Sequence, residues 1–352
     1  MWRWIVANLG LILGQAGAVG ALRSALASGR LAHGLLFSGP EGVGKGTTAE
    51  ALGRVFLCDK PSGLDGRAGE VDSCGVCASC KLMDADGRDD GGTHPDYHRV
   101  YRQLVRLKKD SVARDLGVDV IRDYVVAPAG RSSQLGRGKV FVIEEADAMN
   151  TTAQNALLKT LEEPPGRTLI VLLAGSEGAL LPTIRSRCQP VRFAPLAAEL
   201  VVGELVRRGM DEGEAKEAAR LADGSLGEAI RFSGDGLLTV AKELETRLTA
   251  CLTGRSDGEL AKFMKTAGEG LAEKVLERDP DGSKDQATRD SLGLLLRLGE
   301  SSLRRLLRVA RTTGGLEKLC GGIDSLTAAR VNLEGNVNVN LALQQLMAEL
   351  EG

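Results

Sequence analysis

The sequence has no continuous apolar run of the ~18 residues that a membrane-spanning helix needs. Its nearest approach is residues 1–13, which imitate a secretory signal because an apolar stretch follows a single positive charge. Asn8 interrupts this stretch, and the chain then continues into the helical spacing of Val19, Leu22 and Leu26. A removed signal is therefore not predicted, and we expect a cytoplasmic protein.

An excess of charge of either sign is also missing. The 45 Lys and Arg residues face 47 Asp and Glu residues, so the formal net charge is −2. Bulk electrostatic attraction to nucleic acid requires a clear positive excess, so any DNA contact would depend on a local patch or on partner subunits. The 352 residues are 43% hydrophobic and 26% charged, which excludes disorder of the whole chain and predicts two or three domains with their own cores.

Cysteine is concentrated in one part of the chain, where four of the seven residues lie. Cys74, Cys77 and Cys80 are separated by two residues each, and Cys58 lies upstream at the end of a predicted helix. This is metal-ligand spacing. Thiolates so close together repel one another unless a cation neutralises them, and zinc bound by four sulfurs has a closed shell, as in structural sites. We therefore predict a zinc module at about residues 58–84.

Two other interpretations of the cysteine cluster are open. Three closely spaced cysteines and a remote one also bind iron–sulfur clusters, although the proline that often follows the last cysteine of such a motif is absent after Cys80. Free thiols or disulfides in a surface loop are the second alternative. His94 and His98 lie nearby, but a lone histidine near a site is more often an ordinary hydrogen-bonding residue, so neither is included as a ligand.

A glycine-rich loop with a lysine follows the apolar segment 35–37, and a helical pattern over residues 49–57 follows the loop. Strand, glycine-rich loop, lysine and helix in this order predict a P-loop in an α/β domain. The glycines let backbone N–H groups point at phosphate oxygens, while the helix N-terminus and the lysine add positive potential. ATP is the expected ligand type. The candidate contacts in the loop are Gly39, Gly42, Gly44, Lys45, Gly46 and Thr47.

The residue after the P-loop lysine departs from the usual pattern. Ser or Thr normally follows Lys45 and holds magnesium, but here the residue is Gly46. Thr47 is not a simple replacement, because one residue along a helix turns the side chain by about 100°. ATP binding can survive this change, since the backbone N–H groups and the lysine remain.

A second nucleotide element is the apolar segment 139–143, which predicts a buried strand ending in acids. Its order matches a Walker B strand, in which an Asp normally orients magnesium. Glu144 stands in that place with an extra methylene, while Glu145 keeps the place of the water-activating carboxylate. With both metal-orienting positions altered, we expect ATP hydrolysis to be absent or very weak.

Three further segments resemble the clamp-loader branch of the AAA+ ATPases. They are residues 150–165, which end in Glu-Glu-Pro-Pro, the predicted strand 169–173, and residues 181–188, which end in Ser-Arg-Cys. Asn150 or Thr151 can cap a helix that the two prolines terminate.

In that family the arginine of the Ser-Arg-Cys motif reaches the nucleotide site of the neighbouring subunit. The resemblance therefore implies that Arg187 is an arginine finger that acts in trans.

Within that family the chain is most similar to the delta-prime type found in bacterial DNA polymerase III. It lacks the Tyr-Arg-Pro opening usual in the ATPase type, it is short, and Gly227 replaces the sensor arginine of that type. The segment 334–343 resembles the end of a delta-prime collar, and the cysteine cluster lies where both types carry a zinc module.

The resemblance implies a heteropentameric loader in which ATP binding lets the ring open a sliding clamp and place it on primed DNA. This chain would be its rigid member, with other clamp-loader subunits as direct partners. An active ATPase subunit of the same family is an alternative. A zinc-containing stand-alone P-loop NTPase or kinase is another, but it leaves Arg187 without a role.

Breaks in the sequence patterns predict three domains: an α/β P-loop (AAA+, RecA-like) domain over 1–195, an all-α lid over 196–240 and an all-α collar over 241–352. Leucines at helical spacing in the third region predict buried helix faces. The basic segment 99–114 is interpreted as a solvated loop rather than a DNA contact. Its basic residues include Arg102, Arg106, Lys108 and Lys109.

Overall fold

The chain divides into two compact units, residues 1–197 and 198–352, in the computed structural model. The structure describes residues 8–63, 70–84, 93–102, 104, 116–234, 236–255, 258–278, 283–310, 312–335 and 337–351. The first unit is α/β and the second is all-helical in its described parts, as the sequence predicts.

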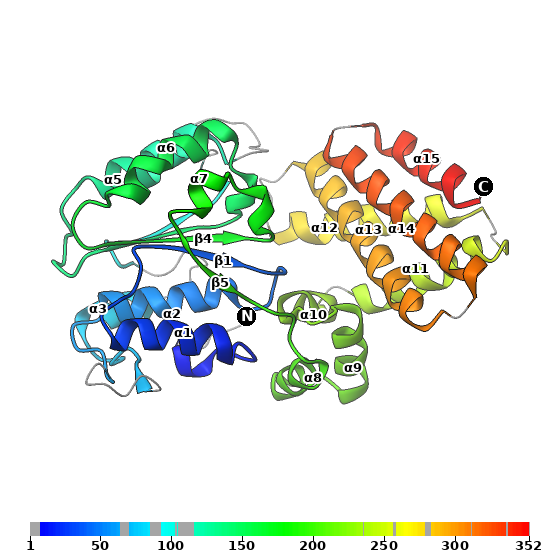
Figure 1. Ribbon diagram of the computed structural model, residues 1–352. Helices are drawn as coiled ribbons and strands as arrows, with labels where there is room; N and C mark the ends of the chain where they lie inside the picture. Colours follow the sequence, from blue (N-terminus) through cyan, green and yellow to red (C-terminus); the bar gives the residue numbers. More distant parts are fainter. Residues whose placement is uncertain are drawn as a thin grey trace. The chain divides into compact units, whose positions relative to one another are not determined.

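A five-stranded parallel sheet forms the centre of the first unit, with the strand order β2-β3-β4-β1-β5 (Figure 1). Its strands are β1 Gly34–Ser38, β2 Tyr97–Val100, β3 Lys139–Ile143, β4 Thr168–Ala174 and β5 Gln189–Arg192. Every residue of β1, β3 and β4 is buried, which explains their unbroken apolar runs. The strands predicted at 35–37, 139–143 and 169–173 are confirmed.

Helices cover both faces of this sheet (Figure 1). The helical segments are η1 Leu9–Leu11, α1 Ala16–Ala27, α2 Lys45–Leu57, α3 Ala78–Asp84, α4 Val118–Ile121, η4 Arg122–Val126, α5 Ala127–Ala129, η5 Ala146–Ala148, α6 Thr151–Glu162, η6 Glu177–Ala179 and α7 Pro182–Arg185. Apolar side chains of α1 and α2 pack on one face. Those of α4 and α6 pack on the other face.

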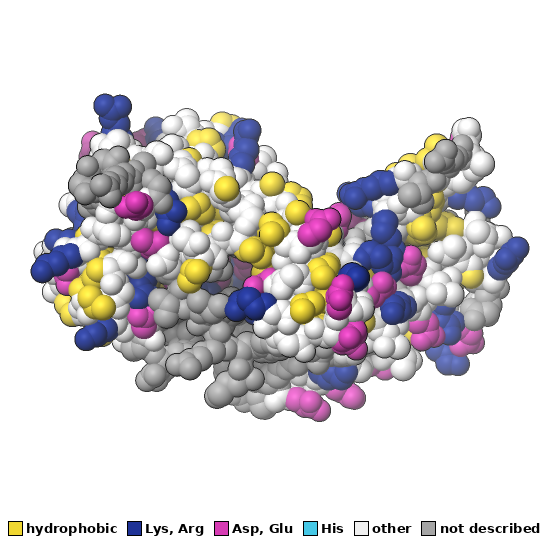
Figure 2. All heavy atoms as spheres, turned by 90° about the horizontal axis from the view of Figure 1, so that it is seen from below, with side chains coloured by type: hydrophobic (Ala, Val, Ile, Leu, Met, Phe, Trp, Pro, Cys, Tyr) yellow, Lys and Arg dark blue, Asp and Glu magenta, His cyan; other side chains and the backbone are white. Residues whose placement is uncertain are grey.

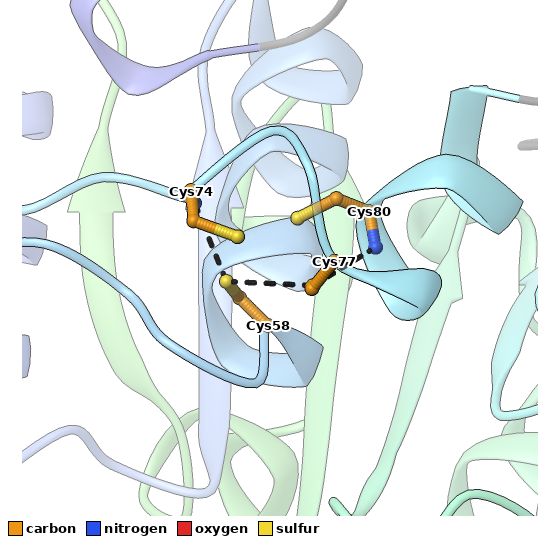
Figure 3. Close-up of side chains that lie close together, drawn as sticks. All are labelled: Cys58, Cys74, Cys77 and Cys80. Atoms are coloured by element: carbon orange, nitrogen blue, oxygen red, sulfur yellow. Dashed lines mark hydrogen bonds between the residues drawn. The ribbon is translucent and has the colours of Figure 1, made fainter.

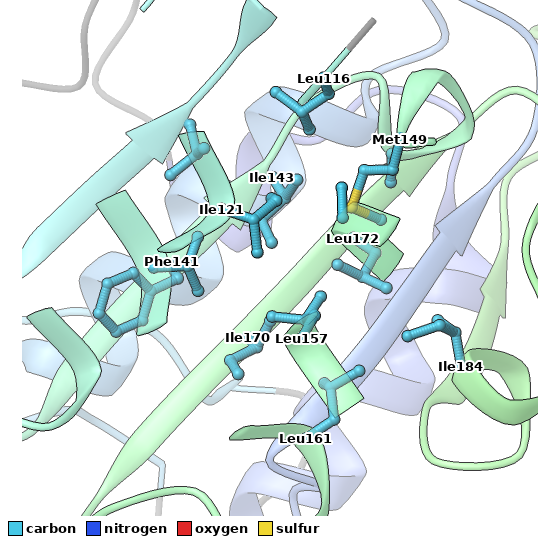
Figure 4. Packing of buried hydrophobic residues seen from close by; sticks show 14 of the residues in the cluster. Leu116, Ile121, Phe141, Ile143, Met149, Leu157, Leu161, Ile170, Leu172 and Ile184 are labelled. Atoms are coloured by element: carbon cyan, nitrogen blue, oxygen red, sulfur yellow. The ribbon is translucent and has the colours of Figure 1, made fainter. Parts of the chain in front are cut away.

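Helix α6 shows how local sequence signals position one of these layers. Asn150 caps it, since its Oδ1 accepts a hydrogen bond from the Ala153 N–H at 2.9 Å. Leu157 and Leu161 are fully buried against β3 and β4 (Figure 4). The helix ends at Glu162, before the two prolines, so the predicted start and stop are both confirmed.

The second unit contains α8 Ala198–Arg207, α9 Glu212–Leu221, α10 Leu226–Gly234, α11 Leu237–Leu252, α12 Leu260–Arg278, α13 Lys284–Val309, α14 Thr313–Glu334 and α15 Val339–Glu351. Leucines of α13 that share a helical face are fully buried, as predicted. They include Leu292, Leu295 and Leu303. The predicted division between residues 240 and 241 falls within α11, and the lid and collar remain predictions. Among the described helices, none has the length and apolar character required to cross a membrane.

Charged side chains of both signs lie close together over the surface shown in Figure 2. In the helical unit Glu245 forms ion pairs with Arg220 at 3.2 Å and with Arg305 at 2.5 Å. Glu300 forms another with Arg330 at 3.2 Å. Such partly exposed pairs add little stability individually. They do show that three arginines of this unit are balanced by acids of the same chain.

The backbone at Gly39 joins the end of β1 to the phosphate loop and permits only glycine. Its φ is +144°, and an added Cβ would collide with the Phe193 carbonyl. Gly44 also has a positive φ, +104°, but an added Cβ there would meet nothing within 4 Å. Substitution of Gly44 therefore tests backbone strain alone, whereas substitution of Gly39 tests backbone strain together with a steric collision.

We predict that Gly44→Ala lowers the local stability of the first unit by roughly 1–2 kcal/mol, the cost of left-handed backbone for an L-residue. Gly39→Ala should cost about 1–3 kcal/mol more, because overpacking is added. Hydrogen–deuterium exchange over β1 measures the opening free energy. Equal effects of the two substitutions would contradict the collision.

Candidate functional site

The four clustered cysteines come together at the far end of α2. Cys58 caps the C-terminus of α2, Cys74 and Cys77 lie in the turn before α3, and Cys80 lies in the first turn of α3. Their side chains point toward one another (Figure 3). All four Sγ atoms lie within 4.8 Å of one another, and those of Cys58 and Cys77 are 3.9 Å apart. The loop closes as the spacing predicts.

Backbone N–H groups are directed at these sulfurs. The N–H of Cys74 donates to Cys58 Sγ at 3.3 Å, and the N–H of Cys80 donates to Cys77 Sγ at 3.4 Å. N–H groups of Val76 and Cys77 lower the pKa of the Cys74 thiol to about 6. Burial raises the pKa of Cys58 and of Cys80. Burial thus disfavours the thiolate form of this pair, and a metal ion beside the sulfurs would offset that penalty.

The four sulfurs lie within 4.8 Å of one another, and one of their distances matches a small tetrahedral ion. Metal–sulfur bonds of ~2.3 Å in a tetrahedron place sulfurs about 3.8 Å apart, close to the 3.9 Å between Cys58 and Cys77. A cluster of several irons would occupy the space between the sulfurs and hold them further apart. His94 is not available as a ligand, since its Nε2 contacts Ser79 Oγ at 2.8 Å and its Nδ1 accepts from the Asp96 N–H. His98 stacks on Phe141.

The P-loop lies at the carboxyl edge of the sheet, directly after β1. Lys45 starts α2, and its Nζ donates to the carbonyls of Gly39 at 2.5 Å and Pro40 at 2.6 Å. Burial lowers the pKa of Lys45, while the Glu41 and Asp147 carboxylates act in the opposite direction. The Lys45 side chain therefore folds back against the loop that would hold a phosphate group.

The two acids after β3 are each paired with an arginine. Arg99 on β2 donates from Nε to Glu144 Oε1 at 2.7 Å. Arg102 donates a hydrogen bond to each carboxylate oxygen of Glu145, one from Nε and one from Nη2, both at 2.6 Å. Glu144 and Glu145 are thus at the same edge as the P-loop, and each carboxylate has an arginine partner.

Arg187 lies at the opposite edge of the sheet. Its carbonyl lies next to Gly34, the first residue of β1, whereas the P-loop begins beyond Ser38 at the other end of that strand. The intervening residues span about 13 Å at ~3.3 Å per residue. The Arg187 guanidinium donates to Glu162 Oε1 from Nε at 2.7 Å and to the Thr183 carbonyl from Nη1 at 3.0 Å. The structure does not bring Arg187 to the P-loop of its own chain.

The sequence interpretation missed the roles of Arg99 and Arg102, which it assigned to a solvated basic loop. Adjacent parallel strands end together, so a basic residue near the end of β2 was a signal for a partner after β3. Arg106, Lys108 and Lys109 of that segment lie outside the described residues.

Three polar side chains at the same edge were also not predicted. Glu177 Oε1 accepts from Ser38 Oγ at 2.8 Å and from Arg192 Nε at 3.0 Å. These residues come from three distant segments, and no local pattern marks them. They connect the start of the P-loop to the ends of β4 and β5.

Parallel strands in the order β2-β3-β4-β1-β5, with a P-loop after β1 and acids after β3, define the first unit as a P-loop domain of the AAA+ type. A family model described as "DNA polymerase III, delta subunit" matches residues 14–197, more than half of the chain. The chain therefore belongs to the DNA polymerase III delta-subunit family. The predicted fold class is confirmed.

Individual relatives agree with this assignment. The chain is 37% identical to DNA polymerase III subunit delta′ of Pseudomonas aeruginosa over 209 residues, 58% of this chain and 57% of that protein. It is also 37% identical to subunit delta′ of Escherichia coli over 210 residues, 59% of this chain and 57% of that protein. Subunit tau of Bacillus subtilis is 29% identical over 293 residues, 78% of this chain and 46% of that protein.

The chain thus spans just over half the length of the delta′ relatives that it matches. The predicted resemblance to a clamp-loader subunit of delta-prime type is confirmed by these matches.

We predict that the chain purified under reducing conditions carries about one metal ion, because four thiols in one tetrahedral arrangement need a cation. Cys77→Ser removes one ligand and should release most of the metal, measured by elemental analysis. Cys320→Ser, at an exposed cysteine outside the cluster, should retain it. Metal-free wild-type protein, or equal retention by both variants, would refute the site.

Proposed function

We propose that this chain is a non-hydrolysing, delta-prime-type subunit of a DNA polymerase III clamp loader, in which Arg187 completes the nucleotide site of a neighbouring subunit. The observation that carries this proposal is the location of Arg187 at the amino edge of the sheet, away from the P-loop of its own chain. An arginine that cannot reach its own phosphates can serve a nucleotide held by another polypeptide.

The contacts of Arg187 support a positioned rather than a freely moving side chain. Glu162 holds the guanidinium from one side, and the Thr183 carbonyl and Ser186 hydroxyl hold Nη1. The side chain remains 34% exposed. An arginine fixed in this way loses less conformational entropy when it contacts phosphate, which favours its use as a finger.

The proposed partners are the other clamp-loader subunits and, through the assembled ring, a sliding clamp and primed DNA. The relatives named DNA polymerase III subunits delta′ and tau support this choice. A net charge of −2 supports contact with DNA through the complex rather than by this chain alone. Residues 196–240 would be the lid and residues 241–352 the collar that joins the ring. A role in bacterial replication would place the protein in the cytoplasm.

Zinc is the metal that we propose for the four cysteines. Four sulfurs leave no open position for chemistry, so the ion would fasten residues 58–84 and take no part in nucleotide turnover. Iron in the purified protein would overturn this assignment.

Three features support a nucleotide site without turnover. Gly46 offers no hydroxyl to magnesium, Glu144 is longer than the usual Asp and is paired with an arginine, and Gly227 lacks a sensor guanidinium. The alternative of an active ATPase draws on the match to subunit tau, which covers more of this chain at lower identity. The altered residues at the magnesium positions favour a nucleotide site without turnover.

We predict that the isolated chain hydrolyses ATP at least about 100-fold more slowly than the ~1 s⁻¹ at the low end of typical enzymes. The reason is that Gly46 and Glu144 replace the two residue types that usually position magnesium. Phosphate release by the isolated protein measures the rate, and Lys45→Ala identifies any background from a contaminant. Turnover near 1 s⁻¹ that Lys45→Ala abolishes would establish the active-ATPase alternative.

In the assembled complex, Arg187→Ala should leave folding, metal content and assembly unchanged while lowering clamp- and DNA-stimulated ATPase. Hydrolysis at the one site that depends on Arg187 should fall by about 10³-fold or more. The total ATPase rate of the complex then falls only by the fraction that this site contributes. Arg187→Lys should recover little, because lysine lacks the planar fork.

Arg185→Ala is the matched control for this experiment, since Arg185 is an exposed arginine at the end of α7, two residues before Arg187. It should leave both ATPase and clamp loading unchanged. Full activity of complexes that contain Arg187→Ala would remove the proposed role in trans.

A further inference from the structure

Two guanidinium groups occupy the edge of the sheet where a P-loop protein places its divalent cation. Arg99 lies on β2 and Glu144 directly follows the neighbouring strand β3. The Glu144 N–H donates to the Val100 carbonyl at 2.8 Å, which fixes the two residues beside each other. Both are only 27% exposed. The pair is therefore partly withdrawn from water, where an ion pair is screened less than on the open surface.

The charge of Arg99 is retained in this setting. Burial opposes it, but the carboxylate of Glu144, with Tyr97 and Glu50 nearby, outweighs burial and raises the pKa of Arg99. The extra methylene of Glu144, compared with the usual Asp, lets its carboxylate extend further toward the neighbouring strand. Glu in place of Asp at position 144 thus weakens the binding of magnesium and at the same time favours an ion pair with Arg99.

The second pair repeats this arrangement on the adjacent acid. Arg102 uses two parallel N–H donors on the two oxygens of Glu145, the bidentate geometry that makes arginine–carboxylate pairs strong. Glu145 adopts φ +50° and ψ +44°, a left-handed conformation that is uncommon for a non-glycine residue. A carboxylate engaged at both oxygens has poor geometry left for binding the water shell of a metal.

The helix side of the site offers no hydroxyl in the usual place. Gly46 has no side chain, although an added Cβ would meet only Leu173 Cδ1 at 3.9 Å, so the space exists. Thr48 is buried and its hydroxyl donates to the Gly44 carbonyl at 2.8 Å. Thr47 follows Gly46 and is turned by about 100° around the helix. The residues present therefore do not fit magnesium.

The phosphate-binding part of the site is retained. The loop places Gly39, Gly42 and Gly44 in positive-φ conformations, and Lys45 begins a helix of 13 residues. Loop N–H groups, helix N-terminus and lysine all attract anions without requiring a metal. The site therefore keeps the groups that bind phosphate but lacks those that hold magnesium. This combination suits a nucleotide without a bound metal ion.

We propose that this P-loop binds a nucleoside di- or triphosphate as the free anion, without a divalent cation, because Arg99 and Arg102 neutralise the acids that would otherwise recruit magnesium. This inference rests on the proposal that the site binds nucleotide without turning it over. It adds the form of the ligand and the two residues that determine it.

A fluorescent ATP analogue, titrated into the full-length chain in magnesium buffer and in excess EDTA, tests the inference. The two dissociation constants should agree within about threefold. Lys45→Ala should weaken binding at least about tenfold in both buffers, which verifies that the P-loop is the site. No binding in either buffer, or binding that EDTA weakens more than about tenfold, overturns the inference.

Arginine variants then test the cause. Arg99→Ala combined with Arg102→Ala uncovers two carboxylates, so affinity in EDTA should fall at least about tenfold and magnesium should restore most of it. Arg102→Ala alone, at a more exposed residue, should show part of this magnesium dependence even where the double variant is unstable. Arg122→Ala, an exposed arginine on η4, is the matched control and should behave as wild type.

Magnesium-independent binding by both arginine variants would show that the pairs do not set the metal requirement, and would overturn the inference. These outcomes are separate from those for Arg187, which concern hydrolysis at a site in another subunit. Failure of the proposed role of Arg187 would therefore leave the metal-free nucleotide site standing, and failure of that site would leave the role of Arg187 standing.

Discussion

The parallel direction of all five strands is the constraint on which the sites of this protein depend. Residues that follow a strand meet at one edge of the sheet, and residues that precede a strand meet at the other. The P-loop after β1 and the acids after β3 therefore share the carboxyl edge. Arg187, which precedes β5, is placed at the amino edge beside Gly34. One chain thus presents a phosphate loop and an arginine that cannot serve it.

The carboxyl edge is also where charge compensation decides the chemistry. Acids at partly buried positions are stabilised by an ionic partner or a cation, because isolated charges there are costly. Here Arg99 and Arg102 provide the compensation from within the chain. A fixed guanidinium cannot coordinate a phosphate together with a water shell as a metal ion does. In the proposed metal-free site, the same two ion pairs that neutralise these acids would therefore oppose the binding of magnesium at this edge.

Sequence reasoning was most successful where a local pattern carries the information. The strands at β1, β3 and β4, the cap at Asn150 and the four cysteines were all evident from spacing and residue type. The partners of Glu144 and Glu145 were not, because Arg99 and Arg102 are more than forty residues away along the chain. The register of β2 on β3 is needed to pair them, and the Glu177 contacts with Ser38 and Arg192 depend on tertiary structure in the same way.

Helix α2 connects the two sites, since Lys45 begins it and Cys58 follows its last residue. At ~1.5 Å per residue its 13 residues separate the P-loop from the cysteine cluster by about 20 Å. Its inner face is held to the sheet by apolar side chains such as Leu52, which is fully buried. Burying each such side chain contributes roughly 1.5–3 kcal/mol without any metal. The metal would therefore determine how the chain continues beyond α2, while packing on the sheet determines where the helix itself lies.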